Sequence, residues 1–319
     1  MTTKSVSQES SPVLLGVRSG SYHIIRTSGY GNRTMDEYEY SAPFSILHAA
    51  SLLSQRSRLS KFERALKRVV TEDSYVVDLG TGTGVLAMIA ARAGARKVTA
   101  VEIDGISVQY AKQAIKQNGL EDIIEVVRSH YANFKPRNKA DIVICEMLSS
   151  AMLVEPQVPA SQWAVERILK EEGILLPRSA TVYIAPVECH SIWERFNTAG
   201  FDFPRVPQTM DREESRDLAD LAVLEEFDFF LHQDEWIVDK RLEFTIVGNG
   251  TVHGFVGLFE AHLIDEIKLT MEDGWRDLLL PIIEPVRVSQ GDRLSVDIYY
   301  STAMIDTLRV NCQKIAANK

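Results

Sequence analysis

The stretch Asp78–Gly84, which reads DLGTGTG, constrains the fold of this chain more than any other part of its sequence. The apolar run YVV precedes it, and an apolar stretch of helical length follows it and stops at Gly94. Small residues at such a turn let the backbone bend sharply and approach a bound molecule closely. A strand, a glycine loop and a helix in this order predict the first unit of a nucleotide-binding α/β domain.

The segments around this loop alternate between predicted strands and predicted helices. Further strands are expected at KVTAVEID, IIEVVR and ADIVICE, and helices at residues 45–70, 107–117 and 162–172, the last closed by Gly173. This alternation is typical of parallel βαβ units in a doubly wound sheet. Residues 45–177 are therefore predicted to form a Rossmann-like α/β domain, and residues 1–44 a flexible tail and lid segment.

The pattern changes near Pro177, where short strand-like segments separated by turn residues replace the alternation. The segments are ATVYIAPVE, RLEFTIV, GTVHGFVGLFEAHL, IKLTM and RLSVDIYY. Such a series predicts a mostly antiparallel sandwich or β-barrel over residues 178–319. An insertion rich in aromatic and charged residues, 191–231, interrupts the series, and we expect it to be mainly helical.

Composition narrows the class of protein. The chain has 319 residues, 45% of them hydrophobic, which suits a globular protein with a substantial core. No apolar run approaches the roughly 18 residues of a membrane-spanning helix, and the Ser/Thr-rich start lacks the apolar segment of a signal peptide. The net charge of −9 argues against nucleic-acid binding. The three cysteines lack metal-ligand spacing, so we expect no metal and a reducing, cytoplasmic location.

The spacing of the glycine loop narrows the ligand. A phosphate-binding P-loop needs a lysine after its last glycine, and a dinucleotide fingerprint needs a glycine where Val85 stands. The observed G-x-G-x-G spacing suits a methionine-derived sulfonium nucleoside, which carries no phosphate. Glu102 ends the second strand, 24 residues after Asp78, where it can accept hydrogen bonds from both ribose hydroxyls. The candidate cofactor-binding residues are therefore Asp78, Gly80, Gly82, Gly84 and Glu102.

Two glutamates follow the fourth strand. Glu146 stands where that strand ends, and Glu155 comes nine residues later, after a stretch in which two serines are almost the only polar residues. The carboxyl end of such a strand borders the ligand crevice of a doubly wound sheet. A carboxylate among apolar residues is costly unless a cation meets it, which predicts a cationic substrate. For a single glutamate at a strand end, a solvated loop charge is the alternative.

The paired glutamates, with eight residues between them, resemble the double-glutamate loop of the protein arginine methyltransferases. VVDLGTGTGVLAMIAARAGARKVTAVE is similar to the cofactor loop of that family, and EEGILLPRSATVYIAPVE to its junction into a β-barrel. HGFVGLFEAHL and GWRDLLLPIIEPVRVSQGDRL resemble two of its barrel segments. The resemblance covers about residues 45–300. It implies an enzyme that uses S-adenosyl-L-methionine to methylate arginine.

The resemblance also implies roles for single residues. Glu146 and Glu155 would be the catalytic pair that holds a guanidinium, whose paired N–H donors fit carboxylates. Arg56 would bind the carboxylate of the cofactor and brace Glu146. Asn133 would stand near the adenine, where family members often have an acid. The residues expected to contact the substrate are Tyr38, Tyr40, Met147 and Trp275.

The chain departs from the family around the substrate. The Tyr-Phe-x-x-Tyr motif of the family corresponds here to MDEYEYSAPF, in which Tyr38 and Tyr40 have another spacing. The Thr-His-Trp loop of the family corresponds to Asp273-Gly274-Trp275, so its histidine is missing. These changes leave the residues for methyl transfer in place. The acceptor could be protein-bound arginine, free arginine or another small guanidine.

A homodimer is a further implication of the resemblance. Gly200-Phe201-Asp202 resembles part of the dimerisation arm of the family, which docks on the cofactor domain of a second subunit. The expected apolar anchors are Trp193, Phe196, Phe201 or Phe203, and an insertion that folds back on its own barrel is the alternative. For the activity, two rivals remain: a methyltransferase of another small cationic molecule, and a catalytically inactive scaffold homologue.

Overall fold

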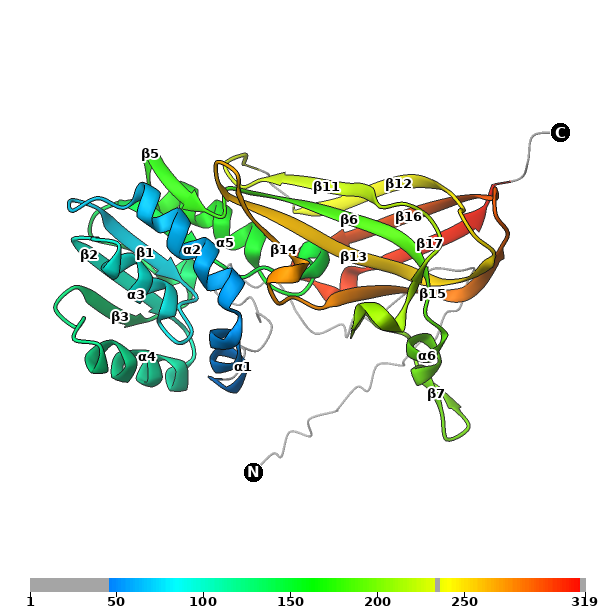
Figure 1. Cartoon of the computed structure of the whole chain (residues 1–319), viewed down its shortest axis with the longest axis horizontal. Helices are drawn as coiled ribbons and strands as arrows, with labels where there is room; N and C mark the ends of the chain where they lie inside the picture. The colour runs from blue at the N-terminus through cyan, green and yellow to red at the C-terminus, as the bar shows by residue number, and fades with distance from the viewer. Residues whose placement is uncertain (1–45, 233–235, 316–319) are drawn as a thin grey trace, which may run out of the picture.

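The computed structural model describes residues 46–232 and 236–315. Tyr38, Tyr40 and the rest of the predicted lid segment lie outside the described residues. In Figure 1 the molecule is elongated, with a parallel sheet and its helices at one end and long antiparallel strands at the other. None of the described helices is long and apolar enough to cross a membrane.

The first unit is built on a parallel sheet of five strands in the order β3-β2-β1-β4-β5. The strands are β1 (Tyr75–Leu79), β2 (Lys97–Glu102), β3 (Ile124–Arg128), β4 (Ala140–Cys145) and β5 (Leu169–Leu176). Central β1 is almost fully buried and pairs with β2 on one side and β4 on the other. The strand order reverses between β1 and β4, which is where ligands bind in open α/β sheets. The predicted Rossmann-like fold is confirmed.

Helices accompany this sheet, but not all of them where the sequence predicts. They are α1 (Ile46–Ser51), α2 (Arg56–Val69), α3 (Val85–Arg92), α4 (Gly105–Gln117) and α5 (Gln157–Trp163). The single helix predicted at 45–70 is wrong, because a 3-10 turn and the non-helical residue Gln55 separate α1 from α2. The Gln55 amide donates to Gly274 O at 3.0 Å and its carbonyl oxygen accepts from Arg58. These tertiary contacts fix Gln55 at the break.

The helix predicted at 162–172 is also wrong. Helix α5 ends at Trp163, a π-helical turn covers Ala164–Ile168, and the rest of the segment belongs to β5. A side chain at Gly173 would lie 2.6 Å from the Leu169 side chain, so this glycine permits close packing within β5 rather than ending a helix. Leu169 and the residues from Ile174 to Leu176 pair with β4, on either side of a register shift that contains Lys170, Glu171 and Glu172. Sheet pairing at both ends thus overrides the local helix propensity of these three residues.

The second unit is antiparallel. One sheet of seven strands contains the path β10-β6-β13-β15-β9, with β11 added beside β6 and β14 beside β13, and a second sheet has the order β12-β16-β17. The longer strands are β6 (Ser179–Glu188), β11 (Ala222–Asp228), β12 (Ile237–Thr245), β13 (Gly250–Ile264), β15 (Asp277–Val288), β16 (Arg293–Ser301) and β17 (Arg309–Lys314). The shorter ones are β9 (Gln208–Met210), β10 (Arg216–Asp217) and β14 (Ile267–Thr270). Antiparallel pairing is confirmed, and closure into a barrel stays a prediction.

The insertion at 191–231 is not mainly helical, contrary to the prediction. It holds the end of a short helix, α6 (His190–Trp193), and 3-10 turns, while β9, β10 and β11 within it pair with β15 and β6. A small hairpin, β7 (Asn197–Thr198) and β8 (Phe201–Asp202), turns at Ala199 and Gly200, which both have positive φ. This hairpin projects from the antiparallel unit in Figure 1.

One apolar core runs through both units. Its fully buried side chains include Phe62 of α2, Leu79 of β1, Phe259 of β13 and Tyr300 of β16. The predicted boundary at residue 177 falls between β5 and β6, which are separated by two residues. Because the core is shared, segments at the junction are held from both sides.

Candidate active site

A cavity of about 770 Å³ lies at the carboxyl ends of β1, β2 and β4 and continues to the antiparallel unit. The predicted site residues that line it are Asp78, Gly80, Gly82, Glu102, Glu146, Met147, Glu155 and Trp275. Three others in the described chain, Arg56, Gly84 and Asn133, do not line it. Most of the predicted site residues in the described chain therefore line the cavity.

Asp78 fixes the glycine loop through hydrogen bonds. This residue is 1% exposed, and its Oδ2 accepts hydrogen bonds from Thr81 Oγ1 at 2.5 Å and from Ala87 N at 3.1 Å. Burial raises the pKa of Asp78 to about 6, although both hydrogen bonds oppose the rise. Asp78 thus joins β1 to the start of α3 and fixes the shape of the loop.

Gly80 shows why this loop excludes side chains. Its φ of +71° is in the left-handed region, and a Cβ added there would lie 2.9 Å from the Met147 side chain. Gly84 has a different task, because it faces Ala111 of α4 rather than the cavity. Only the first two glycines of the motif form the wall, and the third permits close packing between loop and helix.

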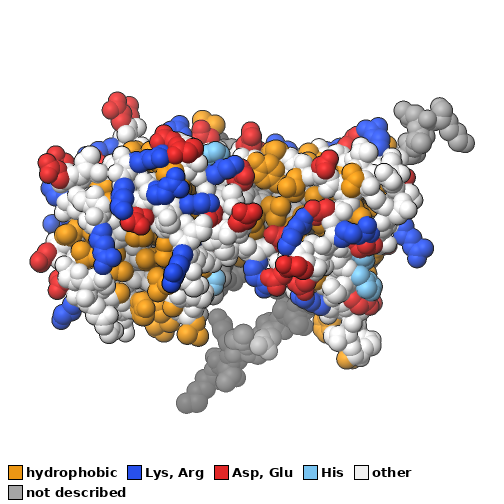
Figure 2. Space-filling model, in the orientation of Figure 1, with side chains coloured by type: hydrophobic (Ala, Val, Ile, Leu, Met, Phe, Trp, Pro, Cys, Tyr) orange, Lys and Arg blue, Asp and Glu red, His pale blue; other side chains and the backbone are white. Residues whose placement is uncertain are grey.

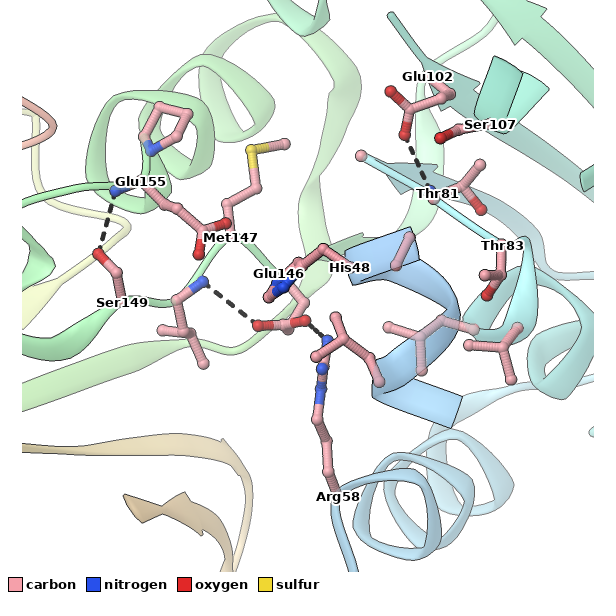
Figure 3. A pocket seen from close by; sticks show the side chains of 18 of the residues that line it. His48, Arg58, Thr81, Thr83, Glu102, Ser107, Glu146, Met147, Ser149 and Glu155 are labelled. Atoms are coloured by element: carbon pink, nitrogen blue, oxygen red, sulfur yellow. Dashed lines mark hydrogen bonds and ion pairs between the residues drawn. The ribbon is translucent and has the colours of Figure 1, made fainter. Parts of the chain in front are cut away.

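Backbone N–H groups occupy most of the hydrogen-bond acceptor positions of Glu102. Its Oε2 accepts from Gly82 N at 2.9 Å, and its Oε1 accepts from Ile103 N at 2.8 Å and Asp104 N at 2.9 Å. A carboxylate offers about four acceptor positions, so about one remains for a ligand in this arrangement. Glu102 therefore ties the glycine loop to the end of β2 as well as facing the cavity (Figure 3).

Glu146, at the end of β4, forms an ion pair with Arg58 (Figure 3). Arg58 is 6% exposed, donates from Nη1 to Gln55 Oε1 at 3.2 Å, and lies 5.1 Å from the centre of the Trp275 ring. Burial lowers the pKa of Arg58 to about 10, while Glu155 and Asp78 act in the opposite direction. One buried cation thus faces three carboxylates, and the site holds an excess of negative charge.

Glu155 is the buried carboxylate that most lacks a positive partner. Burial raises the pKa of Glu155 to about 8, and the charge of Arg58 only partly opposes the rise. Its backbone N–H donates to Ser149 Oγ at 3.0 Å, which fixes where the side chain begins. Figure 3 shows both glutamate side chains reaching into the same space, near Met147. This arrangement favours a cation that enters the cavity and contacts both carboxylates.

Comparisons with known proteins agree with this geometry. A family model described as Ribosomal protein L11 methyltransferase (PrmA) matches residues 63–182. The chain is 27% identical over 282 residues to an arginine N(omega)-methyltransferase of Streptomyces achromogenes subsp. streptozoticus, which covers 82% of this chain and 77% of that protein. It is 40% identical over 162 residues to protein arginine N-methyltransferase 6 of Danio rerio. This match covers 49% of this chain and 45% of that protein. The chain is thus similar to members of the protein arginine methyltransferase family.

A solved structure shows the same fold. The Trypanosoma brucei PRMT1 enzyme-prozyme heterotetrameric complex with AdoHcy matches with a TM-score of 0.71 and 22% identity, over 85% of this chain and 93% of that chain. The matched part spans only about half the length of several curated relatives.

Arg58, and not the predicted Arg56, lines the cavity and pairs with Glu146. Arg56 is exposed and does not line the cavity, whereas Arg58 is buried there. Two residues of an α-helix turn the side chain by about 200°, so the two arginines lie on nearly opposite faces of α2. A signal was available in the sequence: Arg58 shares a helical face with Phe62, Ala65 and Leu66, which are all buried.

Asn133 is also misplaced in the prediction. Residues Tyr131–Asn133 form a 3-10 turn that leaves Asn133 exposed, while Ser129, His130 and Tyr131 line the cavity. His130 Nδ1 accepts from Ala132 N at 3.1 Å, and burial lowers the pKa of His130 to about 4. A neutral histidine therefore borders the cavity where the sequence comparison predicted an acid or amide.

The loop between the two glutamates is held by the antiparallel unit. Trp275 Nε1 donates to Leu148 O at 2.9 Å, and Tyr300 OH donates to Ala151 O at 2.7 Å. Ala151 and Met152 both have positive φ, an unfavourable conformation for residues with a side chain. Sequence reasoning missed Tyr300 because it lies 149 residues from its partner, and no local pattern relates the two.

The segment that lacks the family histidine has an ionic connection instead. Asp273 is 3% exposed and accepts from Ser57 Oγ and Lys61 Nζ of α2, each at 2.6 Å. Gln55 donates to Gly274 O in the same place. These bonds fix Trp275 against Arg58. Among the described residues, no group of three His, Cys, Asp or Glu is placed to hold a metal ion.

Proposed function

We propose that this chain is an S-adenosyl-L-methionine-dependent N-methyltransferase that acts on the guanidinium of arginine. The proposal rests on one observation, that Glu146 and Glu155 line the same cavity as the glycine loop. The raised pKa of Glu155 indicates that Arg58 does not supply enough positive charge for both glutamates. A guanidinium would supply the missing charge and would offer paired N–H donors to the carboxylates.

The inner part of the cavity fits the proposed cofactor. Gly80 and Gly82 leave the backbone bare, Glu102 retains an acceptor for a ribose hydroxyl, and Arg58 could meet the carboxylate of an amino-acid group. Among the described lining residues there is no lysine to bind a phosphate. When bound, the cofactor supplies an electrophilic methyl group on sulfur.

The chain's own residues would hold and activate the acceptor. Arg58 and the Leu148 N–H fix Glu146, and Ser149 fixes the start of Glu155. Two fixed carboxylates would draw positive charge to the nitrogens they contact, which leaves the third nitrogen more nucleophilic. That nitrogen must lose a proton after it is methylated. Glu155, with its raised pKa, is suited to accept it.

Mass spectrometry after incubation with S-adenosyl-L-methionine tests the proposal. The acceptors are free L-arginine, an Arg/Gly-rich peptide and buffer alone. Methylation of either guanidine above the buffer control would support the proposal, and methylation of neither would refute it. An inactive scaffold is not favoured, because both glutamates, Glu102 and the glycine loop share one cavity. The similarity to arginine N-methyltransferases favours a guanidinium over a different cation.

Glu102→Gln is expected to weaken S-adenosyl-L-methionine binding by roughly 1–3 kcal/mol, because a charged acceptor becomes a neutral amide that also donates. The amide must face at least one of the Gly82, Ile103 and Asp104 N–H groups with a donor. Isothermal titration calorimetry measures the affinity. Glu125→Gln, on exposed β3, is the matched control and should bind normally. An unchanged affinity for Glu102→Gln would remove the ribose contact from the proposal.

Acceptor use should rise with pH. The pKa of Glu155 is raised to about 8, so below that pH the carboxyl is mostly protonated and cannot pair with a guanidinium. The value of kcat/KM for the acceptor, which reports the free enzyme, should therefore increase through about pH 8 and then level off. Glu155→Gln should remove this rise from its residual activity. A flat profile in the unmodified protein would show that Glu155 titrates elsewhere.

We also propose that the protein is a homodimer formed through the β7–β8 hairpin. Phe201 and Phe203 are 67% and 50% exposed there, which is unusual for large apolar side chains of a monomer. Figure 2 shows apolar side chains gathered along the lower edge of the parallel-sheet unit, where Figure 1 places α1 and α4. Exposed apolar residues on these two helices are Leu47, Ile106 and Tyr110. A two-fold contact between hairpin and helices would bury both surfaces.

Light scattering tests the dimer. The unmodified protein should have twice the 35.8 kDa mass of one chain. The double variant Phe201→Ser/Phe203→Ser should have the mass of a single chain. Leu231→Ser/Val247→Ser, which also removes two exposed apolar residues, should stay dimeric. A monomeric unmodified protein would refute the proposal. Trp193 is not proposed as an anchor, since its indole donates to Ile282 O and stacks on Arg205 of its own chain.

A cytoplasmic location is also proposed. It rests on three free cysteines, of which Cys145 and Cys189 are buried and Cys312 is partly buried. Reduced cysteines of this kind are typical of proteins in a reducing compartment.

A further inference from the structure

The outer part of the cavity carries a charged group that the proposed methyl transfer does not use. On the side of the antiparallel unit, Thr209, Gly274, Trp275, Arg276 and Leu278 line the cavity. Arg276 is the one ionisable residue among these described lining residues. A cation here is unexpected, because the acceptor is itself cationic and because strongly basic peptide tails would be repelled.

The backbone places Arg276 beside the glutamate loop. Ser150, which lies between Glu146 and Glu155, donates from Oγ to Arg276 O at 2.8 Å. The preceding residue, Trp275, donates to Leu148 O of the same loop. These two bonds hold the backbone at Arg276 against the loop that carries both glutamates.

The guanidinium of Arg276 is oriented but has donors to spare. Its Nε donates to Asp211 Oδ1 at 3.1 Å, and its Nη1 lies 3.5 Å from Thr209 Oγ1. No described residue accepts from Nη2. Both partners of the ion pair are largely accessible, 52% for Arg276 and 64% for Asp211, so the pair contributes little energy and can accommodate a ligand. Asp211 itself does not line the cavity.

A carboxylate is the group that such an arginine binds best, through paired N–H donors. Within one small molecule, a guanidinium at the glutamates and a carboxylate farther out describe a guanidino acid, and arginine is the α-amino acid of this kind. Its ammonium group would then face the Asp211 side of the rim. We propose that Arg276 binds the carboxylate of free arginine, so that the acceptor is the amino acid rather than a basic protein tail. This inference rests on the proposed function.

Agmatine, which is arginine without its carboxylate, provides the test. The unmodified protein should use L-arginine with a KM at least tenfold below that for agmatine. Arg276→Ala should raise the KM for L-arginine about tenfold, the loss expected for a charge-assisted contact, and leave the KM for agmatine within about twofold. The value of kcat should change little for either acceptor. Calorimetric titration of the two ligands should show the same difference in affinity without catalysis.

Arg287→Ala is the matched control, because Arg287 is exposed on β15 and does not line the cavity. It should leave both KM values unchanged. Equal losses for L-arginine and agmatine in Arg276→Ala would overturn the inference, as would equal use of the two by the unmodified protein. Methylation of the Arg/Gly-rich peptide alone would refute the inference and keep the proposed function. Methylation of no guanidine would refute both.

Discussion

Glu146→Gln should lower the rate of arginine methylation by about 10²-fold or more, the usual loss when a preorganised electrostatic contact is removed. Glutamine preserves the shape of the side chain and can still accept from Leu148 N. It loses the negative charge that the acceptor guanidinium requires and that Arg58 also meets. Single-turnover kinetics at saturating acceptor would measure the chemical step without product release.

Two further measurements show where the loss arises. Calorimetry with S-adenosyl-L-methionine should give an affinity close to that of the unmodified protein, because Glu102 and the glycine loop are untouched. Glu121→Gln, an exposed residue before β3 that does not line the cavity, should keep the normal rate. Near-normal turnover by Glu146→Gln would remove this glutamate from the mechanism. A parallel loss of cofactor affinity would instead point to collapse of the shared site.

Arg58→Met should destabilise the fold by about 3–5 kcal/mol, the usual effect of removing one partner from a buried ion pair. Glu146 would remain with a side-chain exposure of 7% and without its cation. The contact with the Trp275 ring and the hydrogen bond to Gln55 would also be lost. Urea unfolding followed by circular dichroism would measure the change.

The neighbouring arginine provides a close control. Arg56→Met changes the same residue type two positions away on the exposed face of α2, and should alter the unfolding free energy by less than about 0.5 kcal/mol. The double variant Arg58→Met/Glu146→Leu removes both buried charges and should recover much of the stability, though not the activity. Equal effects of Arg56→Met and Arg58→Met would show that the burial of Arg58 has no energetic role.

The position of Arg58 shows how sequence reasoning can miss by a small number of residues. The basic residues of α2 are close together, and the family resemblance implied the role for Arg56. The helical phase separates them, because only Arg58 shares a face with the buried Phe62. The prediction for Asn133 fails for a related reason: it lies in a 3-10 turn that leaves it exposed. In both cases the segment was near the cavity, and local conformation decided which side chain faced it.

The sequence by itself determined the parallel core of this protein and the carboxylates that line its cavity. Each of β1, β2 and β4 is a short apolar run bounded by turn residues, and Asp78, Glu102 and Glu146 follow from where those runs end. Patterns of this kind act within a few residues, so they can be read without knowing the rest of the chain. The prediction that Glu146 and Glu155 act together also agrees with the structure, since one loop carries both and both line the same cavity.

Only the tertiary structure decided what depends on distant partners. The segment with Lys170, Glu171 and Glu172 is extended because the residues on either side of it pair with β4. The segments β9, β10 and β11 are strands because they pair with β15 and β6. The left-handed loop at Ala151 is held by Tyr300, far along the chain. Arg276 lies at the cavity because Ser150, far from it in the sequence, donates a hydrogen bond to its backbone oxygen. Backbone pairing and side-chain contacts across such separations leave no local pattern, because their energy exists only once the chain has folded.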